Sequence, residues 1–156
     1  MKKNYKKIVA TCLFLFTILS IQAQNITLSI ENAVITNDGS DDFYEADIMI
    51  SSTTDYIQGS GQFYLDYNTA AFGSNVVTAG AITYELPGTI LGSSSGFPNY
   101  KDFNDVDNSS SKVSYIWQQG LSEGSIATDN VTSTPSVLVH VKIKYIDSSQ
   151  NANICF

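Results

Sequence analysis

The pattern that most limits the fold of this chain is an alternation of apolar and polar side chains over residues 137–145. Its apolar members are Val137, Val139, Val141, Ile143 and Tyr145, and the residues between them are Leu138, His140, Lys142 and Lys144. A period of two with one apolar face is typical of a half-buried antiparallel strand and does not fit a helix. We therefore predict a strand here whose even-numbered residues, Leu138 included, face away from the core.

Shorter runs of the same kind recur along the chain and are separated by turn-forming residues. Strands are predicted over residues 43–51, 62–67 and 112–117, and weaker ones over 26–30, 33–36, 76–83 and 100–106. Asn, Asp, Gly and Ser fill residues 37–40, 92–96 and 107–111, which predicts turns and loops. Short strands at this spacing, with few helix formers, indicate an all-β fold, and we predict one antiparallel β-sandwich domain over residues 24–156.

The first 23 residues have the build of a secretory signal peptide. Four lysines precede a short apolar run over residues 8–21, and small or neutral residues follow up to Ala23. The run is too short for a membrane span. We expect residues 1–23 to be removed, which leaves a secreted, extracellular or cell-surface protein without a stable membrane span.

Signal removal makes the remaining chain strongly acidic. It would carry four of the eight lysines and all fifteen acids, a net charge of −11, because the sequence has no arginine. Such a protein repels phosphate backbones, so nucleic acid is excluded as a partner. Of the two cysteines, Cys12 lies in the signal, so no intrachain disulfide is possible. Cys155 could pair with another chain, but we expect it to pack as a small apolar residue.

No catalytic motif is complete. Residues 92–96 match G-x-S-x-G, but they lie in a Ser/Gly loop without a following helix, and His140 is the only histidine. That histidine has no partner at zinc-ligand spacing. We therefore predict that the protein is not an enzyme.

Calcium is the only cofactor that the acidic loops suggest, and no metal site is assigned. The run from Asp105 resembles the first half of a calcium loop, but Ser110 and Ile116 stand where an EF-hand needs Gly and Glu. Looser candidate sites are formed by Asp102, Asp105 and Asp107, or by Asp38, Asp41 and Asp42.

Aromatic residues are the best ligand-binding candidates. Flat rings stack on the apolar faces of sugars, and neighbouring amides supply hydrogen bonds. The rings on apolar strand faces, Tyr67, Tyr115, Trp117 and Tyr145, are expected in the core. The predicted surface candidates are Tyr56, Tyr64, Tyr84 and Tyr100, with Gln58 and Gln62.

Three segments of the chain resemble a known protein family. They are residues 43–50, residues 59–73 with the pair Tyr67-Asn68, and the closing strand at 137–145. They resemble the N-terminal module of secreted bacterial proteins exported by the type IX pathway, and cohesin-like β-sandwiches related to cellulose- and chitin-binding modules. The resemblance implies an immunoglobulin-like or jelly-roll sandwich and a non-catalytic role, with a polysaccharide as the first candidate ligand. The alternative is a cohesin-like protein-interaction or adhesion module at the cell surface.

The chain's last residues bear on this resemblance. The largely apolar end at residues 153–156 is predicted to start another strand. Two interpretations follow: the last residues close the sheet, or, since further sequence follows the module in such proteins, the domain is truncated at its C-terminus.

Overall fold

The computed structural model describes residues 25–92, 99–120 and 129–156, so the predicted signal peptide and most of the 92–96 loop lie outside the described residues. The regular secondary structure of the rest is antiparallel strand apart from one short helix, which confirms the all-β prediction. The elements are β1 (Ile26–Asn37), β2 (Asp42–Ser52), β3 (Gly61–Asp66), α2 (Thr69–Phe72), β4 (Ile82–Glu85), β5 (Asn99–Ser109), β6 (Lys112–Gly120) and β7 (Ser136–Lys144).

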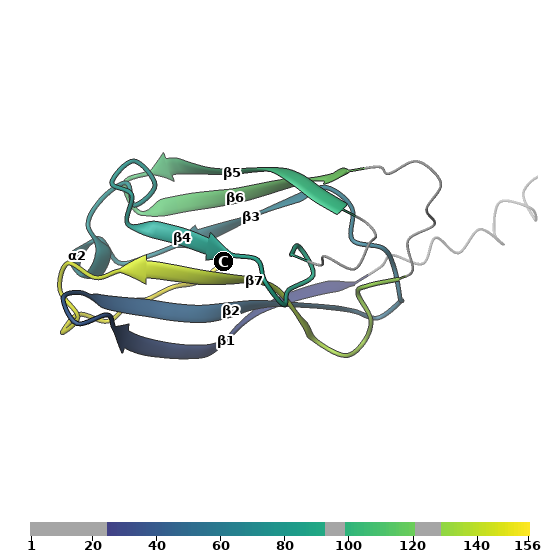
Figure 1. The fold of residues 1–156 in the computed structure, drawn as a ribbon, viewed down its shortest axis with the longest axis horizontal. Helices are drawn as coiled ribbons and strands as arrows, with labels where there is room; N and C mark the ends of the chain where they lie inside the picture. Colours follow the sequence, from purple (N-terminus) through teal and green to yellow (C-terminus); the bar gives the residue numbers. More distant parts are fainter. Residues whose placement is uncertain (1–24, 93–98, 121–128) are drawn as a thin grey trace, which may run out of the picture.

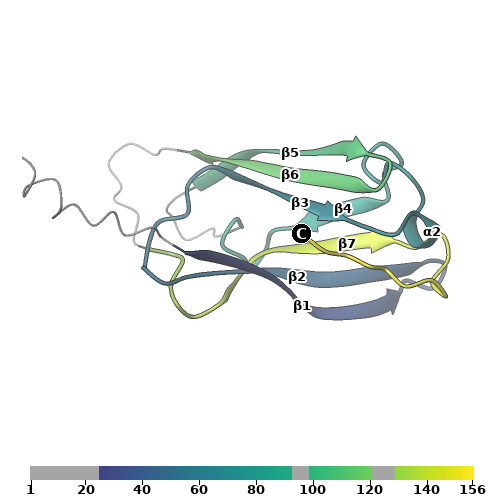
Figure 2. The same ribbon diagram turned by 180° about the vertical axis from the view of Figure 1, so that it is seen from behind.

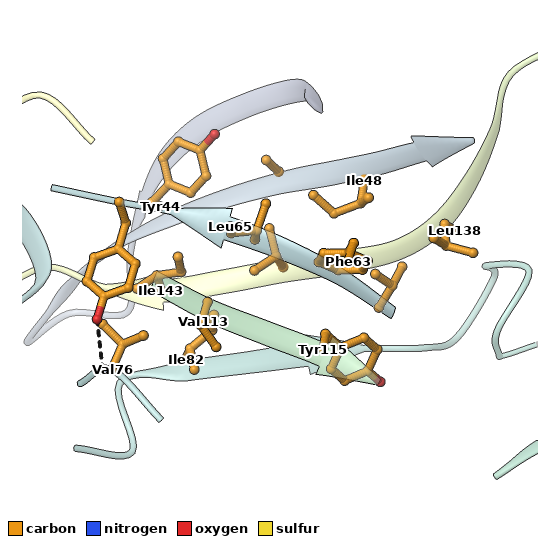
Figure 3. Close-up of a cluster of buried hydrophobic side chains, with 14 of the residues drawn as sticks. Tyr44, Ile48, Phe63, Leu65, Val76, Ile82, Val113, Tyr115, Leu138 and Ile143 are labelled. Carbon is orange, nitrogen blue, oxygen red and sulfur yellow. Dashed lines mark hydrogen bonds between the residues drawn. The ribbon is translucent and has the colours of Figure 1, made fainter. Parts of the chain in front are cut away.

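The strands form two sheets that lie face to face (Figures 1 and 2). One has the order β1-β2-β7-β4, and the other has the order β3-β6-β5. The apolar residues of both sheets meet between the layers, as Figure 3 shows for the centre of the core. Each sheet therefore has one outer face that is free to meet a ligand.

The predicted alternation is confirmed in β2, β3 and β6. In β2 the buried residues are Tyr44, Ala46, Ile48 and Ile50, in β3 Phe63 and Leu65, and in β6 Val113, Tyr115 and Trp117. The tyrosines expected in the core, Tyr67 and Tyr145, are also buried.

Leu138 departs from the predicted pattern, because it is fully buried rather than turned outward. Ile48 pairs with Val139 while Met49 pairs with Val137, so Leu138 is an extra residue in β7 at a bulge. The amide of Leu91 donates to the Leu138 carbonyl at 3.3 Å, so the segment before residue 93 lies against this bulge. The sequence could not show the bulge, because a leucine at position 138 is equally compatible with a regular strand.

The edge strands also differ from the prediction. The two runs at 26–30 and 33–36 join into β1, which shifts register between Glu31 and Val34 around Asn32 at φ 54°. The predicted strand over 76–83 is wrong in its first half, because residues 76–80 form a turn and only β4 is a strand. The two amides of this turn that follow Val76 donate to the Asp107 carboxylate, at 3.0 and 2.8 Å, so tertiary bonds decide its conformation.

The Tyr67-Asn68 corner links the start of α2 to the C-terminal residues. The Asn68 side chain caps α2 by accepting from the Ala70 amide at 3.0 Å, and its amide donates to the Asn151 carbonyl at 2.7 Å. The Tyr67 hydroxyl accepts from the Val76 amide, the bond drawn as a dashed line in Figure 3. This corner holds α2, the turn after it and the last residues together.

The final residues lie beside β3, where they form an isolated bridge and not the further strand that was expected. Cys155 and Asp66 exchange both backbone hydrogen bonds in an antiparallel bridge. The Phe156 ring meets the edge of the Phe63 ring, with centroids 6.3 Å apart. Cys155 itself is a free and exposed cysteine.

Candidate functional site: the outer face of the three-stranded sheet

Two of the predicted ligand-binding residues, Gln62 and Tyr64, lie together on the outer face of the three-stranded sheet. Their neighbours in β3, Phe63 and Leu65, point into the core, so alternation turns Gln62 and Tyr64 outward. Tyr64 is 44% exposed, the most exposed of the tyrosines predicted as binders. The prediction therefore holds for the position of these two residues.

The sheet register places other outward side chains beside them. Gln62 and Asn104 flank Ile116 in one row, and Tyr64 and Val106 flank Ser114 in the next. We call these six residues the platform. They come from all three strands, so the platform extends across the whole width of the sheet.

The platform carries no side chain that is charged at neutral pH. Charges on this face of the three strands come at its ends: Lys112 pairs with Asp66 at 3.0 Å at one end, and Lys101 lies at the other. A flat ring, two aliphatic side chains and two amides suit an uncharged partner with both apolar and hydroxyl surfaces.

Ser114, at the centre of the platform, has an unusual environment. It is 1% exposed, and its hydroxyl has no hydrogen-bond partner among the described residues. An unsatisfied buried hydroxyl is unfavourable. Tyr64 and Val106 are its cross-strand neighbours, so Ser114 lies between the exposed ring and an aliphatic side chain.

Three other predicted binders, Tyr56, Gln58 and Tyr100, do gather in one place, but the structure uses their polar groups internally. The Tyr56 hydroxyl donates to Gln58 Oε1 at 2.7 Å, and the Tyr100 hydroxyl donates to the Gln58 carbonyl at 2.7 Å. Asn130, which the sequence analysis missed, donates to the Tyr100 hydroxyl at 2.9 Å and accepts from the Gln58 amide at 2.7 Å.

This network corrects the surface assignment of these residues. Gln58 is 8% exposed, and the rings of Tyr56 and Tyr100 pack against the core. Burial raises the pKa of both tyrosines. Nothing in the sequence distinguished them from exposed tyrosines: Tyr100 bonds to residues 42 and 30 positions away, and Tyr56 forms an isolated bridge with the distant Val131.

Tyr84 is also packed inward, contrary to the surface prediction. It lies on edge strand β4 and stacks on Tyr115 with ring centroids 3.9 Å apart and planes 21° apart. Its hydroxyl is buried and has no partner within the described part of the chain. Burial, with a smaller contribution from Asp105, raises the pKa of the Tyr84 hydroxyl.

The calcium candidates on β5 point to different places. Asp102 is exposed at φ 53° and lies 3.8 Å from Lys101, while Asp107 accepts the two turn amides described above. Across the described ranges, no group of three or more His, Cys, Asp or Glu side chains is arranged to hold a metal ion.

The outer face of the four-stranded sheet has the opposite character. His140 Nδ1 contacts Asp47 Oδ1, and Asn32 donates to the other oxygen of that carboxylate at 2.7 Å. Lys142 lies 2.7 Å from Glu45 one row away, and this bond raises the lysine pKa. These cross-strand pairs depend on register, which the sequence alone did not provide.

Comparisons with family models, with curated proteins and with solved structures find no match to this chain. Within residues 25–92, 99–120 and 129–156, no helix is long and apolar enough to cross a membrane.

Proposed function

We propose that this protein is a secreted, non-catalytic module that binds a neutral polysaccharide on the platform. The observation that carries the proposal is Tyr64, an exposed ring on a sheet face whose neighbouring side chains are amides and aliphatic groups. A sugar ring presents an apolar face for stacking and hydroxyls at its edge for Gln62 and Asn104.

The charge distribution supports a neutral ligand. The acidic residues of the chain would repel anionic polymers, whereas the platform places no carboxylate against an uncharged chain. The cohesin-like form of the sandwich, export by the type IX pathway and a place at the cell surface belong to the same proposal and derive from the resemblance above.

The proposal is tested by sedimentation with insoluble cellulose and chitin, using the protein without residues 1–23. The native protein is expected to co-sediment with at least one of them. Tyr64→Ala should weaken binding at least about tenfold, as expected when a central aromatic contact is lost. Tyr64→Phe should retain binding, because it keeps the ring.

Two results would count against it. If the native protein stays in solution with both polymers, this class of ligand is wrong. If Tyr64→Ala binds like the native protein, the platform is not the site. Val34→Ala, on the other sheet, is the matched control and should bind normally.

A second candidate function, protein interaction or adhesion, is favoured by β1. This edge strand exposes Val34 and Ile35 at 51% and 58%, and exposed apolar residues on a free strand edge are typical of interfaces. A pull-down from the producing cell's envelope fraction separates the candidates. A protein partner that is lost with Val34→Asp and unaffected by Tyr64→Ala supports the second.

A further inference from the structure

A cleft between the two sheets lies apart from the platform's Tyr64. It opens between the edge strands β4 and β5, with a volume of about 340 Å³, and Ile82, Tyr84, Leu86, Phe103, Asp105 and Tyr115 contribute to its lining. This volume lies near the lower end of the range for small-molecule sites, so it suits a single ring rather than a polymer.

The aromatic side chains of the cleft are arranged in nearly parallel layers. Tyr84 stacks on Tyr115, and the Phe103 ring is within 11° of the Tyr115 plane, with centroids 6.1 Å apart. In Figure 3, Ile82 and Tyr115 lie on the same side of the drawn cluster of core side chains. These rings provide an apolar surface at the open edge of the molecule.

Two polar groups of the cleft lack partners. The buried Tyr84 hydroxyl has none among the described residues. For Asp105, no hydrogen bond or ion pair of its carboxylate is found in the same part of the chain. The Asp105 charge adds to the burial that raises the pKa of Tyr84. The phenol therefore stays a donor, and the carboxylate is an acceptor.

These two unmet requirements define the chemistry of a ligand. A metal ion or an ammonium group could satisfy Asp105 but offers no acceptor to Tyr84. An anion could accept from Tyr84 but would be repelled by Asp105. Sugar hydroxyls donate and accept, and a sugar ring has an apolar face for the aromatic surface.

We propose that the cleft between β4 and β5 is a second binding site, specific for one neutral sugar ring held by Tyr84, Asp105 and the aromatic surface between them. This site goes beyond the platform, because it takes a single ring at a sheet edge and does not depend on Tyr64. It gives a reason for keeping an unpaired phenol in the core, where phenylalanine would fit without an unsatisfied group.

The test is a backbone-amide NMR titration with glucose, galactose, mannose and N-acetylglucosamine as separate probes. At least one is expected to cause saturable shifts in β4 and in residues 103–105. Tyr84→Phe and Asp105→Asn should each weaken binding about tenfold, as expected when one hydrogen bond of a small ligand is lost. Well-dispersed spectra of both variants show that they are folded.

Glu85→Gln is the matched control, because Glu85 lies on the same strand but faces outward, and it should bind normally. Tyr64→Ala should also leave the titration unchanged. The proposal is overturned if no probe shifts β4 and β5, or if Asp105→Asn binds like the native protein. Loss of polymer binding in Tyr64→Ala with an intact titration would separate the two sites, and neither result depends on the other.

Discussion

Single residues decide which aromatic side chains are available to a ligand. Of the four tyrosines that the sequence offered, Tyr64 alone alternates with core residues on a sheet face, whereas Tyr84 and Tyr100 pack inward. At the far end of the three-stranded sheet, the Trp117 indole donates to the Gly59 carbonyl at 2.8 Å. This tryptophan lies directly opposite Gly61 across the β3–β6 pair. The fit between this ring and the glycine is what aligns the start of β3.

Gly61→Ala should therefore destabilise the fold. A Cβ at this position would lie 2.4 Å from the Trp117 ring, too close unless the indole or the strand moves. Overpacking of this kind destabilises by about 1–3 kcal/mol. Chemical denaturation followed by tryptophan fluorescence measures the change.

Gly59→Ala is the control for Gly61→Ala. Its Cβ would meet only the Gln119 side chain, at an ordinary 3.8 Å. Equal stability of the two variants would show that the contact between Gly61 and Trp117 does not restrict the strand.

At the scale of elements, the sequence predicted strands well where burial alternates and poorly where tertiary bonds decide. The cores of β2, β3 and β6 were predicted because one face of each is buried, and a shift by one residue would expose it. Three other features were not predicted, since each depends on a partner distant in the chain: the Leu138 bulge, the joining of two runs into β1, and the turn after Val76. For the same reason, the sequence could suggest Tyr64 and Gln62 but not their neighbours on the platform.

Asp107→Ala tests the turn that the sequence missed. The carboxylate accepts the amides of Val77 and Thr78, so its loss leaves two donors of the connection to β4 without a partner. We expect a loss of about 1.5–3 kcal/mol in the free energy of unfolding, the range for hydrogen bonds to a charged group. Faster amide hydrogen exchange should appear at residues 77–78 in the variant.

Asp105→Ala, two residues earlier on the same face of β5, is the matched control. No hydrogen bond or ion pair of its carboxylate is found in the described residues, so it should exchange like the native protein at 77–78. An Asp107→Ala variant with native exchange there would show that the two bonds do not hold the turn.

At the scale of the whole molecule, the two outer faces differ in charge. The four-stranded sheet presents cross-strand ion pairs such as Glu45–Lys142, whereas the platform of the three-stranded sheet is uncharged. Several carboxylates on the first sheet and its turns also have a lowered pKa, chiefly because they accept hydrogen bonds. The tyrosines between the sheets have a raised pKa, chiefly because they are buried. The stability of the whole fold should therefore depend on pH at both ends of the scale.

The dependence of stability on pH at the acidic end is clearest at Asp38, in the turn between β1 and β2. Hydrogen bonds from Asp41 and Ser40 lower the pKa of the Asp38 carboxyl from 3.8 to about 2. A lowered pKa in the folded state stabilises the fold above pH 3.8, and this contribution is lost as the pH falls towards 2. Carboxyl NMR titration should give the low value, and Asp38→Asn should make stability depend less on pH in this window. A carboxyl titrating at its ordinary value would contradict the prediction.

The dependence of stability on pH at the alkaline end follows from the buried tyrosines. Burial is the main cause that raises the pKa of seven of them above 10: Tyr44, Tyr56, Tyr67, Tyr84, Tyr100, Tyr115 and Tyr145. For Tyr115 the value rises to about 12. A raised pKa stabilises the fold fully below the unfolded value of 10, and this stability is lost as the pH rises through the folded values, because only the unfolded chain releases these protons easily. Tyrosinate absorbance in the native protein should therefore lag behind that of the denatured chain, and its late rise should coincide with the loss of β-sheet circular dichroism. Ionisation of all tyrosines near pH 10 with the sheets intact would show that these rings are open to water.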